Sequence, residues 1–269
     1  MVINKLTNLM VNYTEKCNSR CRTCNLWTIK KPKVIPLHIF DELFHSPRCK
    51  DLLETFFTGG ETLMDDHLVE ICRIIEKTHP HMKIMMATNC FEPQEYFDRL
   101  EKIRSMGFYT CVGLSLMGIG RVHDYYRGVE GNFNKVLEMI ELLKGKHFFY
   151  FSYTQMPMSQ HKMVLEFACK HNTHAAVSNF RKDGRFGTSG TNINIPEFEC
   201  VGLRSLIGIH PNGDVSACDH FYPELVVGNL YKTKLEDMDF TKVRKYVEER
   251  KCQPCPIQCW KEFSKNTLG

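Results

Sequence analysis

The sequence predicts an α/β fold, in which a mostly parallel sheet of six strands carries its helices outside and a smaller α+β extension follows. Short apolar runs alternate six times with stretches of helical periodicity between residues 9 and 180, and the connections are short. Such alternation requires crossovers between parallel strands, and six units make an open barrel. The periodicity stops after residue 180. We therefore expect a barrel at residues 1–185 and the extension at residues 186–269.

Short apolar runs place the strands, and apolar residues three and four apart place the helices. The expected strands are Leu9–Tyr13, Leu52–Thr58, Met82–Thr88, Tyr109–Leu116, His147–Gln155 and His174–Phe180. The expected helices are Pro36–Ser46, one that begins at Asp65 or Asp66 and ends before Pro80, Pro93–Met106, one capped by Asn132, and Ser159–His171. In the extension we expect a hairpin of Leu206–Ile209 with Val215–Cys218 around Asn212-Gly213, and a last helix capped by Asp239.

Composition narrows the function classes. The hydrophobic fraction of 43% is typical of globular proteins, and no apolar run reaches membrane-spanning length. The first residues lack the apolar core of a signal peptide, so we expect a cytoplasmic protein without a membrane partner. Net charge is +4, and the basic clusters Lys30–Lys33 and Arg181–Arg185 are not interleaved with aromatic residues. No nucleic-acid partner is expected, and a solvated loop is the expectation for Lys30–Lys33.

The chain has thirteen cysteines, which in a cytoplasmic protein of this length favour metal binding over disulfides. Five of them are scattered. Three of those, Cys72, Cys111 and Cys169, lie in apolar-patterned elements, and we expect them to be small buried hydrophobic residues. The other eight form two groups.

The first group is Cys17, Cys21 and Cys24, in the segment C-N-S-R-C-R-T-C. These spacings let one tight loop point three thiols at one metal centre. Thiolates are soft ligands that suit zinc, copper(I) or iron–sulfur clusters. A structural zinc usually needs four protein ligands, whereas three cysteines can hold three irons of a [4Fe–4S] cube and leave the fourth iron open. The loop follows a strand, where α/β barrels place their chemistry.

This cysteine loop, together with Thr58-Gly59-Gly60-Glu61 after the second strand, resembles the radical S-adenosylmethionine superfamily. The resemblance implies an open partial (β/α)6 TIM barrel. It also implies that Cys17, Cys21 and Cys24 bind a [4Fe–4S] cluster, whose open iron is chelated by the amino and carboxylate groups of S-adenosylmethionine. A zinc knuckle is the alternative for these three thiols.

The same resemblance suggests contacts to the cofactor. Gly59 and Gly60 let the backbone approach closely, and Glu61 would take the cofactor ammonium; a carboxylate at a helix entry is the alternative for Glu61. Asn89 and Ser115 stand at strand tips and resemble the family's polar contacts to the methionyl and ribose groups.

Four further positions bear on the cofactor. Arg127 resembles an arginine near the cofactor carboxylate, with a surface arginine as the alternative. Thr23 stands where the family usually has an aromatic residue near the adenine, and Trp27 is the candidate to take that place. Met117 stands where the family often has an aspartate, so any role of that aspartate is absent here.

The second group comprises the five cysteines of the last 70 residues, Cys200, Cys218, Cys252, Cys255 and Cys259. Zinc ribbons also use paired cysteines, so a structural zinc is the alternative. The spacing resembles the auxiliary-cluster extensions of radical S-adenosylmethionine enzymes, the SPASM domain with two clusters and the shorter twitch domain with one. Five cysteines are too few for the longer form. We expect one auxiliary [4Fe–4S] cluster held by Cys200, Cys218, Cys252 and Cys255, with Cys259 either spare or replacing one of the pair.

In this family the radical belongs to the cofactor and the protein supplies placement. The resemblance implies a flavodoxin- or ferredoxin-type reductant, a 5′-deoxyadenosyl radical and hydrogen abstraction from a small-molecule or peptide substrate. We expect oxidation of a small polar molecule, sugar-like or aminocyclitol-like, with the auxiliary cluster as electron acceptor. No room exists before Asn12 for the leader-peptide-binding domain that peptide-modifying members often carry. Crosslinking or epimerisation of a ribosomal peptide is the alternative, and a non-enzymatic iron–sulfur or zinc protein is the alternative of another class.

Fewer residues in the sequence point to substrate binding or to a general base. Arg181, Arg185 and the loop to Asn194 follow the last strand and would hold an anionic or hydroxyl-rich substrate, with a solvated turn as the alternative. The candidates for a general base, none of them assignable, are Tyr153, His210, Asp219 and His220.

Overall fold

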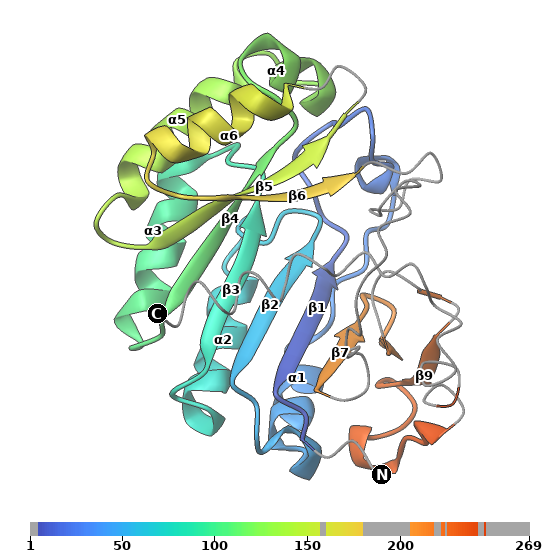
Figure 1. Ribbon diagram of the computed structural model, residues 1–269. Coiled ribbons are helices and arrows are strands. Elements are labelled where there is room, and N and C mark those ends of the chain that lie inside the picture. Colours follow the sequence, from blue (N-terminus) through green and yellow to red (C-terminus); the bar gives the residue numbers. More distant parts are fainter. Residues whose placement is uncertain are drawn as a thin grey trace.

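The computed structural model describes residues 5–156, 160–179, 205–217, 222–223, 225–241 and 245. Its strands form one sheet in the order β6-β5-β4-β3-β2-β1-β7-β8-β9. The first six are parallel and make a curved wall, a partial barrel (Figure 1). These strands are β1 (Asn8–Thr14), β2 (Glu54–Gly59), β3 (Lys83–Thr88), β4 (Thr110–Leu116), β5 (Phe148–Gln155) and β6 (Ala175–Asn179).

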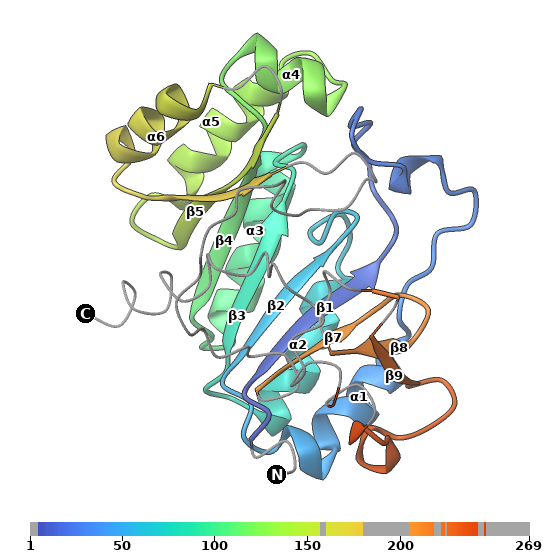
Figure 2. The ribbon, with the colours of Figure 1, turned by 45° about the vertical axis from the view of Figure 1, so that its right-hand side comes forward.

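Helices cover the outer face of this wall (Figures 1 and 2). They are α1 (Leu37–His45), α2 (His67–Thr78), α3 (Pro93–Ser105), α5 (Asn132–Leu143) and α6 (His161–Lys170). A short helix, α4 (Arg121–Arg127), lies between β4 and α5 in the chain, at the carboxyl ends of the strands. The described residues also contain the 3-10 turns η1 (Leu26–Thr28), η2 (Pro47–Cys49) and η4 (Leu235–Asp237).

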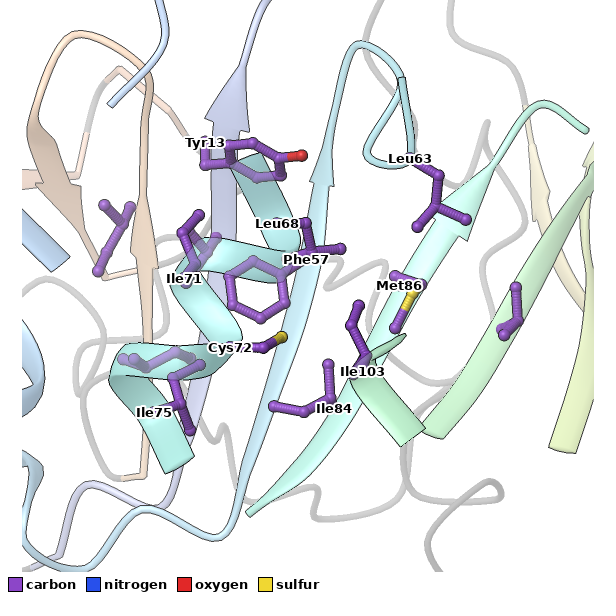
Figure 3. Packing of buried hydrophobic residues seen from close by; sticks show 14 of the residues in the cluster. Tyr13, Phe57, Leu63, Leu68, Ile71, Cys72, Ile75, Ile84, Met86 and Ile103 are labelled. Atoms are coloured by element: carbon purple, nitrogen blue, oxygen red, sulfur yellow. The ribbon is translucent and has the colours of Figure 1, made fainter. Parts of the chain in front are cut away.

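The core lies between the sheet and these helices. The apolar stripe of α2, which includes Leu68, Ile71 and Ile75, packs on Phe57 of β2 and Ile84 of β3 (Figure 3). Burying each side chain of this size contributes about 1.5–3 kcal/mol. Because strand side chains alternate between the two faces, the residues between these core positions point into the barrel.

The extension continues the same sheet. β7 (Leu206–Ile209) pairs in parallel with β1, from Asn8↔Leu206 to Val11↔Ile209. β8 (Asp214–Ser216) and β9 (Val226–Asn229) then follow as antiparallel strands. The predicted boundary near residue 185 lies outside the described residues and stays a prediction.

The predicted alternation is confirmed. The six barrel strands and the helices α1, α3 and α6 begin and end within two residues of the predicted positions, and the Asn212-Gly213 hairpin is present. Some expectations are wrong or incomplete. Gly131, not Asn132, is the N-cap of α5. Cys169 is exposed on α6, whereas Cys72 and Cys111 are buried as expected. The helix α4 and the strand β9 were not predicted, and most of the helix expected after Asp239 lies outside the described residues.

None of the helices in the described part of the chain is long and apolar enough to span a membrane.

Candidate active site

A cavity of about 330 Å³ lies at the carboxyl ends of the barrel strands, the end at which α/β barrels carry their sites. All three cysteines of the first group line it. So do Gly59, Gly60, Asn89, Ser115 and Arg127, each from a different loop or strand end except for the paired glycines. The structure therefore brings together eight of the ten barrel residues that sequence analysis singled out for cluster or cofactor binding. Of the other two, Glu61 is buried, Trp27 is exposed, and neither lines the cavity.

Close backbone contacts hold the start of the cysteine loop. The Glu61 N–H donates to the Lys16 carbonyl oxygen at 2.8 Å, and the Gly60 N–H donates to the Thr14 carbonyl oxygen at 2.7 Å. A Cβ atom at Gly60 would lie 1.9 Å from the Lys16 carbonyl oxygen. Any side chain at Gly60 would therefore displace the residue that precedes Cys17. The Gly-Gly pair is needed for this approach of two loops.

The helix α4 holds the other side of the cysteine loop. The Arg22 N–H donates to the Tyr126 carbonyl oxygen at 2.9 Å, and Arg22 Nε donates to the Tyr125 carbonyl oxygen at 2.9 Å. Gly128, which ends α4 with a φ of 69°, lies against the Arg20 carbonyl oxygen, and a Cβ there would be 2.2 Å from it. The cysteine loop is thus clamped between the loop after β2 and the end of α4.

Arg127, the last residue of α4, is 6% exposed and faces the cavity. Its Nε has no hydrogen-bond partner among the described residues. A buried donor without a partner is costly, so this guanidinium is prepared for a ligand that accepts hydrogen bonds. Arg127 is also the one Lys, Arg, Asp or Glu side chain among the described residues that line the cavity.

Glu61 has both carboxylate oxygens occupied by backbone donors. Its Oε2 accepts from the Asn89 N–H at 2.6 Å and its Oε1 from the Leu63 N–H at 3.0 Å. Complete burial raises the pKa of Glu61, and these hydrogen bonds together with nearby Arg127 oppose the rise. Glu61 therefore joins the loops after β2 and β3, and the atoms from this segment that face the cavity belong to Gly59 and Gly60.

A buried hydrogen-bond chain continues from Asn89 to the loop after β4. The Asn132 side-chain amide donates to the Asn89 carbonyl oxygen at 3.3 Å, and its Oδ1 lies 2.9 Å from His123 Nε2. The Met117 N–H donates to His123 Nδ1 at 3.3 Å. Since Nδ1 accepts, the ring proton is on Nε2, which fixes the tautomer and the orientation of the Asn132 amide. We call the chain from Met117 through His123, Asn132 and Asn89 to Glu61 the buried relay.

The buried relay was missed in the sequence analysis. His123 is fully buried, and burial lowers its pKa to about 4, with Arg127 adding to the effect. The ring is therefore neutral at physiological pH, as an acceptor at Nδ1 requires. Its only sequence signal was a histidine in a segment assigned to no element.

Comparisons with known proteins identify the family. The family model described as the radical SAM superfamily matches residues 11–167, more than half of the chain. The chain belongs to the radical SAM superfamily. A second model, described as the SPASM iron-sulfur cluster-binding domain, matches residues 200–260. The zinc knuckle and the non-enzymatic protein are thereby set aside.

Solved structures share the fold of this radical SAM enzyme. Streptococcus suis SuiB bound to S-adenosylmethionine superposes with a TM-score of 0.68 at 15% identity, over 90% of this chain and 68% of that one. BtrN in complex with AdoMet and 2-DOIA has a TM-score of 0.58 at 16% identity, over 91% and 88% of the two chains. A curated relative, the Caenorhabditis elegans molybdenum cofactor biosynthesis protein moc-5, is 26% identical over 154 residues. That alignment spans 54% of this chain but only 24% of the relative.

The radical SAM cofactors are a [4Fe–4S] cluster and S-adenosylmethionine, and the SPASM match adds auxiliary iron–sulfur binding. The cavity fits the first two. Burial raises the pKa of Cys17 to about 11 and also raises that of Cys24. Buried thiolates need positive charge nearby, and iron supplies it. The unpartnered Arg127 Nε, in turn, suits an anionic group of the cofactor. Cys200, Cys218, Cys252, Cys255 and Cys259 lie outside the described residues, so their assignment stays a prediction.

The structure also places the remaining candidates. Thr23 lines the cavity, with its Oγ1 3.9 Å from Met117 Sδ, whereas Trp27 is 42% exposed and does not line it. Trp27 is therefore not positioned to contact an adenine in this cavity. Tyr153 points into the core between sheet and helices, and His210 lies in the β7–β8 hairpin, 2.8 Å from Ser216 Oγ. Neither lines the cavity. Asp219, His220, Arg181, Arg185 and Asn194 lie outside the described residues.

Proposed function

We propose that this radical SAM enzyme oxidises a small polar molecule rich in hydroxyl groups. The observation that carries the proposal is the chemistry of one cavity wall. The inward positions of β4, β5 and β6 that line the cavity include five hydroxyl-bearing side chains, Ser115, Tyr150, Ser152, Thr154 and Ser178. Cross-strand pairing places Ser115 beside Ser152 and Thr154 beside Ser178. We call this surface the hydroxyl wall.

The hydroxyl wall offers both donors and acceptors without charge, which suits a neutral polyol. The side of the cavity formed by β1, β2 and β3 is more mixed, because Met10, Phe56 and Met85 present thioether and aromatic surface there beside Thr58 and Thr88. Such a division orients a substrate that has one polar and one less polar face. The cavity volume of about 330 Å³ suits ligands of small-molecule size.

Each part of the site has a proposed task. Cys17, Cys21 and Cys24 would hold the cluster, and the backbone at Gly59 and Gly60 would lie beside the cofactor ammonium. When bound, the cluster and S-adenosylmethionine supply reductive cleavage of the cofactor and a radical that abstracts hydrogen. The protein orients the substrate on the hydroxyl wall and excludes water from the buried part of the cavity.

Three cofactor contacts are part of the same proposal. Arg127 would bind the cofactor carboxylate, since its Nε has no partner among the described residues. Asn89 would contact the methionyl group and Ser115 the ribose, both from strand ends at the cavity. Glu61 acts through the loops that it joins, not through direct contact.

A net two-electron oxidation needs an acceptor for the second electron. The predicted auxiliary [4Fe–4S] cluster, held by Cys200, Cys218, Cys252 and Cys255, would supply that acceptor, and a base would take the proton. A reducing, cytoplasmic setting suits this chemistry. The eight cysteines in the described part of the chain are all free thiols.

The test is hydrogen transfer from an isotopically labelled substrate. The anaerobically reconstituted enzyme is incubated with dithionite, S-adenosylmethionine and either a perdeuterated cyclitol, the matching aminocyclitol or a deuterated peptide. We expect deuterium in 5′-deoxyadenosine with a cyclitol-type substrate, and its loss in the Ser152→Ala, Ser178→Ala double variant while unstimulated cofactor cleavage persists. Deuterium transfer from peptides alone would contradict the proposal and favour the peptide-modifying alternative.

A further inference from the structure

The segment from Lys16 to Phe40 is strongly basic. It contains six Lys and Arg residues and no Asp or Glu, whereas the whole chain has 35 basic and 31 acidic residues. The remainder of the chain therefore carries 29 basic and 31 acidic side chains, a net charge of −2. The positive charge of this protein is concentrated in the segment that also contains the three cluster cysteines.

Five of these six cations are exposed: Arg20, Arg22, Lys30, Lys31 and Lys33. We call them the basic face. Within the described residues none of the five forms a salt bridge, whereas the sixth, Lys16, is paired with Asp65 at 3.0 Å. The Glu15 carboxylate accepts the Lys33 backbone N–H at 2.7 Å. The basic face thus presents largely uncompensated charge to solvent.

The basic face belongs to the same stretch of chain as the cluster site. Arg20 and Arg22 flank Cys21 in the sequence, and the Arg22 guanidinium is fixed 4.5 Å above the centre of the Tyr125 ring. The segment that carries Lys30–Lys33 leaves the cysteine loop and runs along the edge of the molecule (Figure 2). One stretch of chain therefore forms both a wall of the cavity and the outer surface beside it.

An apolar centre accompanies the charges. Trp27 is 42% exposed and Ile29 is 37% exposed, between the two arginines and the three lysines in the chain. The Trp27 indole Nε1 donates to the Cys21 carbonyl oxygen at 3.2 Å, while its neighbour Leu26 lines the cavity. An exposed aromatic residue in a segment that also carries arginine is typical of a protein interface.

We propose that the basic face docks an acidic one-electron carrier protein of the ferredoxin type, which reduces the cluster behind it. The inference rests on the proposed cluster at Cys17, Cys21 and Cys24. Opposite charge steers two proteins together and sets their orientation, and electron-transfer pairs use small, weak interfaces that depend on such steering. One electron leaves the carrier and enters the cluster, and no atom is transferred. The interpretation of Lys30–Lys33 as a merely solvated loop is replaced by this proposal.

The test compares two triple variants with equal changes in charge. Lys30→Glu, Lys31→Glu, Lys33→Glu reverses the part of the basic face that is remote from the cysteines. Lys135→Glu, Lys162→Glu, Lys170→Glu reverses three exposed lysines on α5 and α6 and is the control. Both holoenzymes are assayed with reduced plant-type ferredoxin and with dithionite. Ferredoxin affinity is measured independently by calorimetry at low and at high salt.

We expect the basic-face variant to lose about tenfold or more in ferredoxin-driven 5′-deoxyadenosine formation and in ferredoxin affinity. Its dithionite-driven rate should equal that of the wild type, and the affinity of the wild type should fall as salt rises. The control variant should behave as wild type in both assays.

Three results would overturn the proposal or its basis, and they are distinguishable. Equal losses in both triple variants would show a general charge effect and contradict docking at the basic face. Salt-dependent binding of a DNA duplex that is tighter than ferredoxin binding, and lost in the same variant, would assign the surface to nucleic acid. Absence of dithionite-driven cleavage in the wild type would instead contradict the proposed function itself.

Discussion

At the carboxyl ends of the barrel strands, His123 is fully buried and its hydrogen-bond chain runs to Glu61 behind the cavity. At the amino ends, His147 is also buried. Its Nδ1 lies 2.7 Å from Thr110 Oγ1, and its Nε2 lies 2.9 Å from a carboxylate oxygen of Glu101. Each imidazole thus has two partners, and burial lowers the pKa of both rings. The chains end differently, because the Glu101 side chain is 31% exposed to solvent.

This difference shows that the role of a buried polar side chain depends on where its chain of hydrogen bonds ends. The contacts of His147 join β4, α3 and the start of β5 and then reach solvent, so they serve stability. Those of His123 join the loops after β2, β3 and β4, which carry Gly60, Asn89 and Ser115 to the cavity. A buried imidazole with two hydrogen-bond partners is therefore expected to affect cofactor binding at the carboxyl ends of the strands and stability alone at the amino ends.

The largest effect is expected in the cysteine loop, which is held by contacts at the carboxyl ends of the strands. Replacing Cys17, Cys21 and Cys24 with alanine should abolish dithionite-driven cleavage of S-adenosylmethionine, measured as 5′-deoxyadenosine by chromatography, because the cluster loses its thiolates. Cys169→Ala, at an exposed thiol on α6, is the matched control and should retain full cleavage. Measurable cleavage in the triple variant would remove the assignment of these ligands.

A smaller loss is expected at Arg127. The variant Arg127→Met should weaken S-adenosylmethionine binding by about tenfold to a hundredfold, the usual range for a hydrogen bond to a charged group. Arg99→Met is the control, because Arg99 is also largely buried but donates to the Leu63 carbonyl oxygen and to Asp66 outside the cavity. Equilibrium binding to the reconstituted enzyme measures both. Equal affinities in the two variants would make Arg127 a structural cation.

The two histidines give the sharpest comparison. His123→Leu and His147→Leu should each lower the free energy of unfolding by about 1–3 kcal/mol, since each leaves buried partners unsatisfied. Only His123→Leu should also weaken cofactor binding, by about fivefold, because it releases the Met117 and Asn132 contacts that hold the strand ends. His123→Gln, which can accept and donate in the same directions, should recover most of the affinity. Equal effects of both leucine variants on cofactor affinity would contradict a positioning role for the buried relay.

The last difference is expected in the pH dependence of stability. The pKa of His123 is about 4 in the folded chain and about 6.5 when unfolded, so the unfolded chain binds more protons between these values. Stability should therefore fall as the pH drops from 6.5 to 4, by about 3 kcal/mol from this residue. Chemical denaturation at several pH values should show a flatter profile for His123→Gln than for the wild type. An unchanged profile would show that His123 does not contribute the acid sensitivity.

The sequence was sufficient to predict the parts of the fold that repeat. Strand and helix periodicities are local, and the ends of the strands predicted where the cysteine loop and Gly59-Gly60 would meet. The spacing of the thiols likewise predicted one metal centre, because one loop sets their separation, and the family resemblance added the iron–sulfur cluster. Asn89, Ser115 and Arg127 were singled out through the resemblance to the radical SAM superfamily, and all three line the cavity.

The buried relay could not be predicted, because its contacts depend on an unexpected helix. α4 has only seven residues between Gly120 and Gly128, too few to show a helical period. From α4, Asp124 accepts the N–H groups of Gly131 and Phe133 and so caps α5 in place of Asn132. Asn132 is thereby free to join His123 and Asn89. A residue type that favours caps was correctly located but given the wrong task.

The pairing of β1 with β7 has a consequence for synthesis of the chain. Residues 8–11 leave the ribosome 198 residues before their partners at 206–209, an interval of about 10–40 seconds at ordinary translation rates. During that time one edge of β1 has no neighbour, and such an edge readily pairs with other chains. A barrel expressed without its extension would keep this edge open permanently and would tend to aggregate.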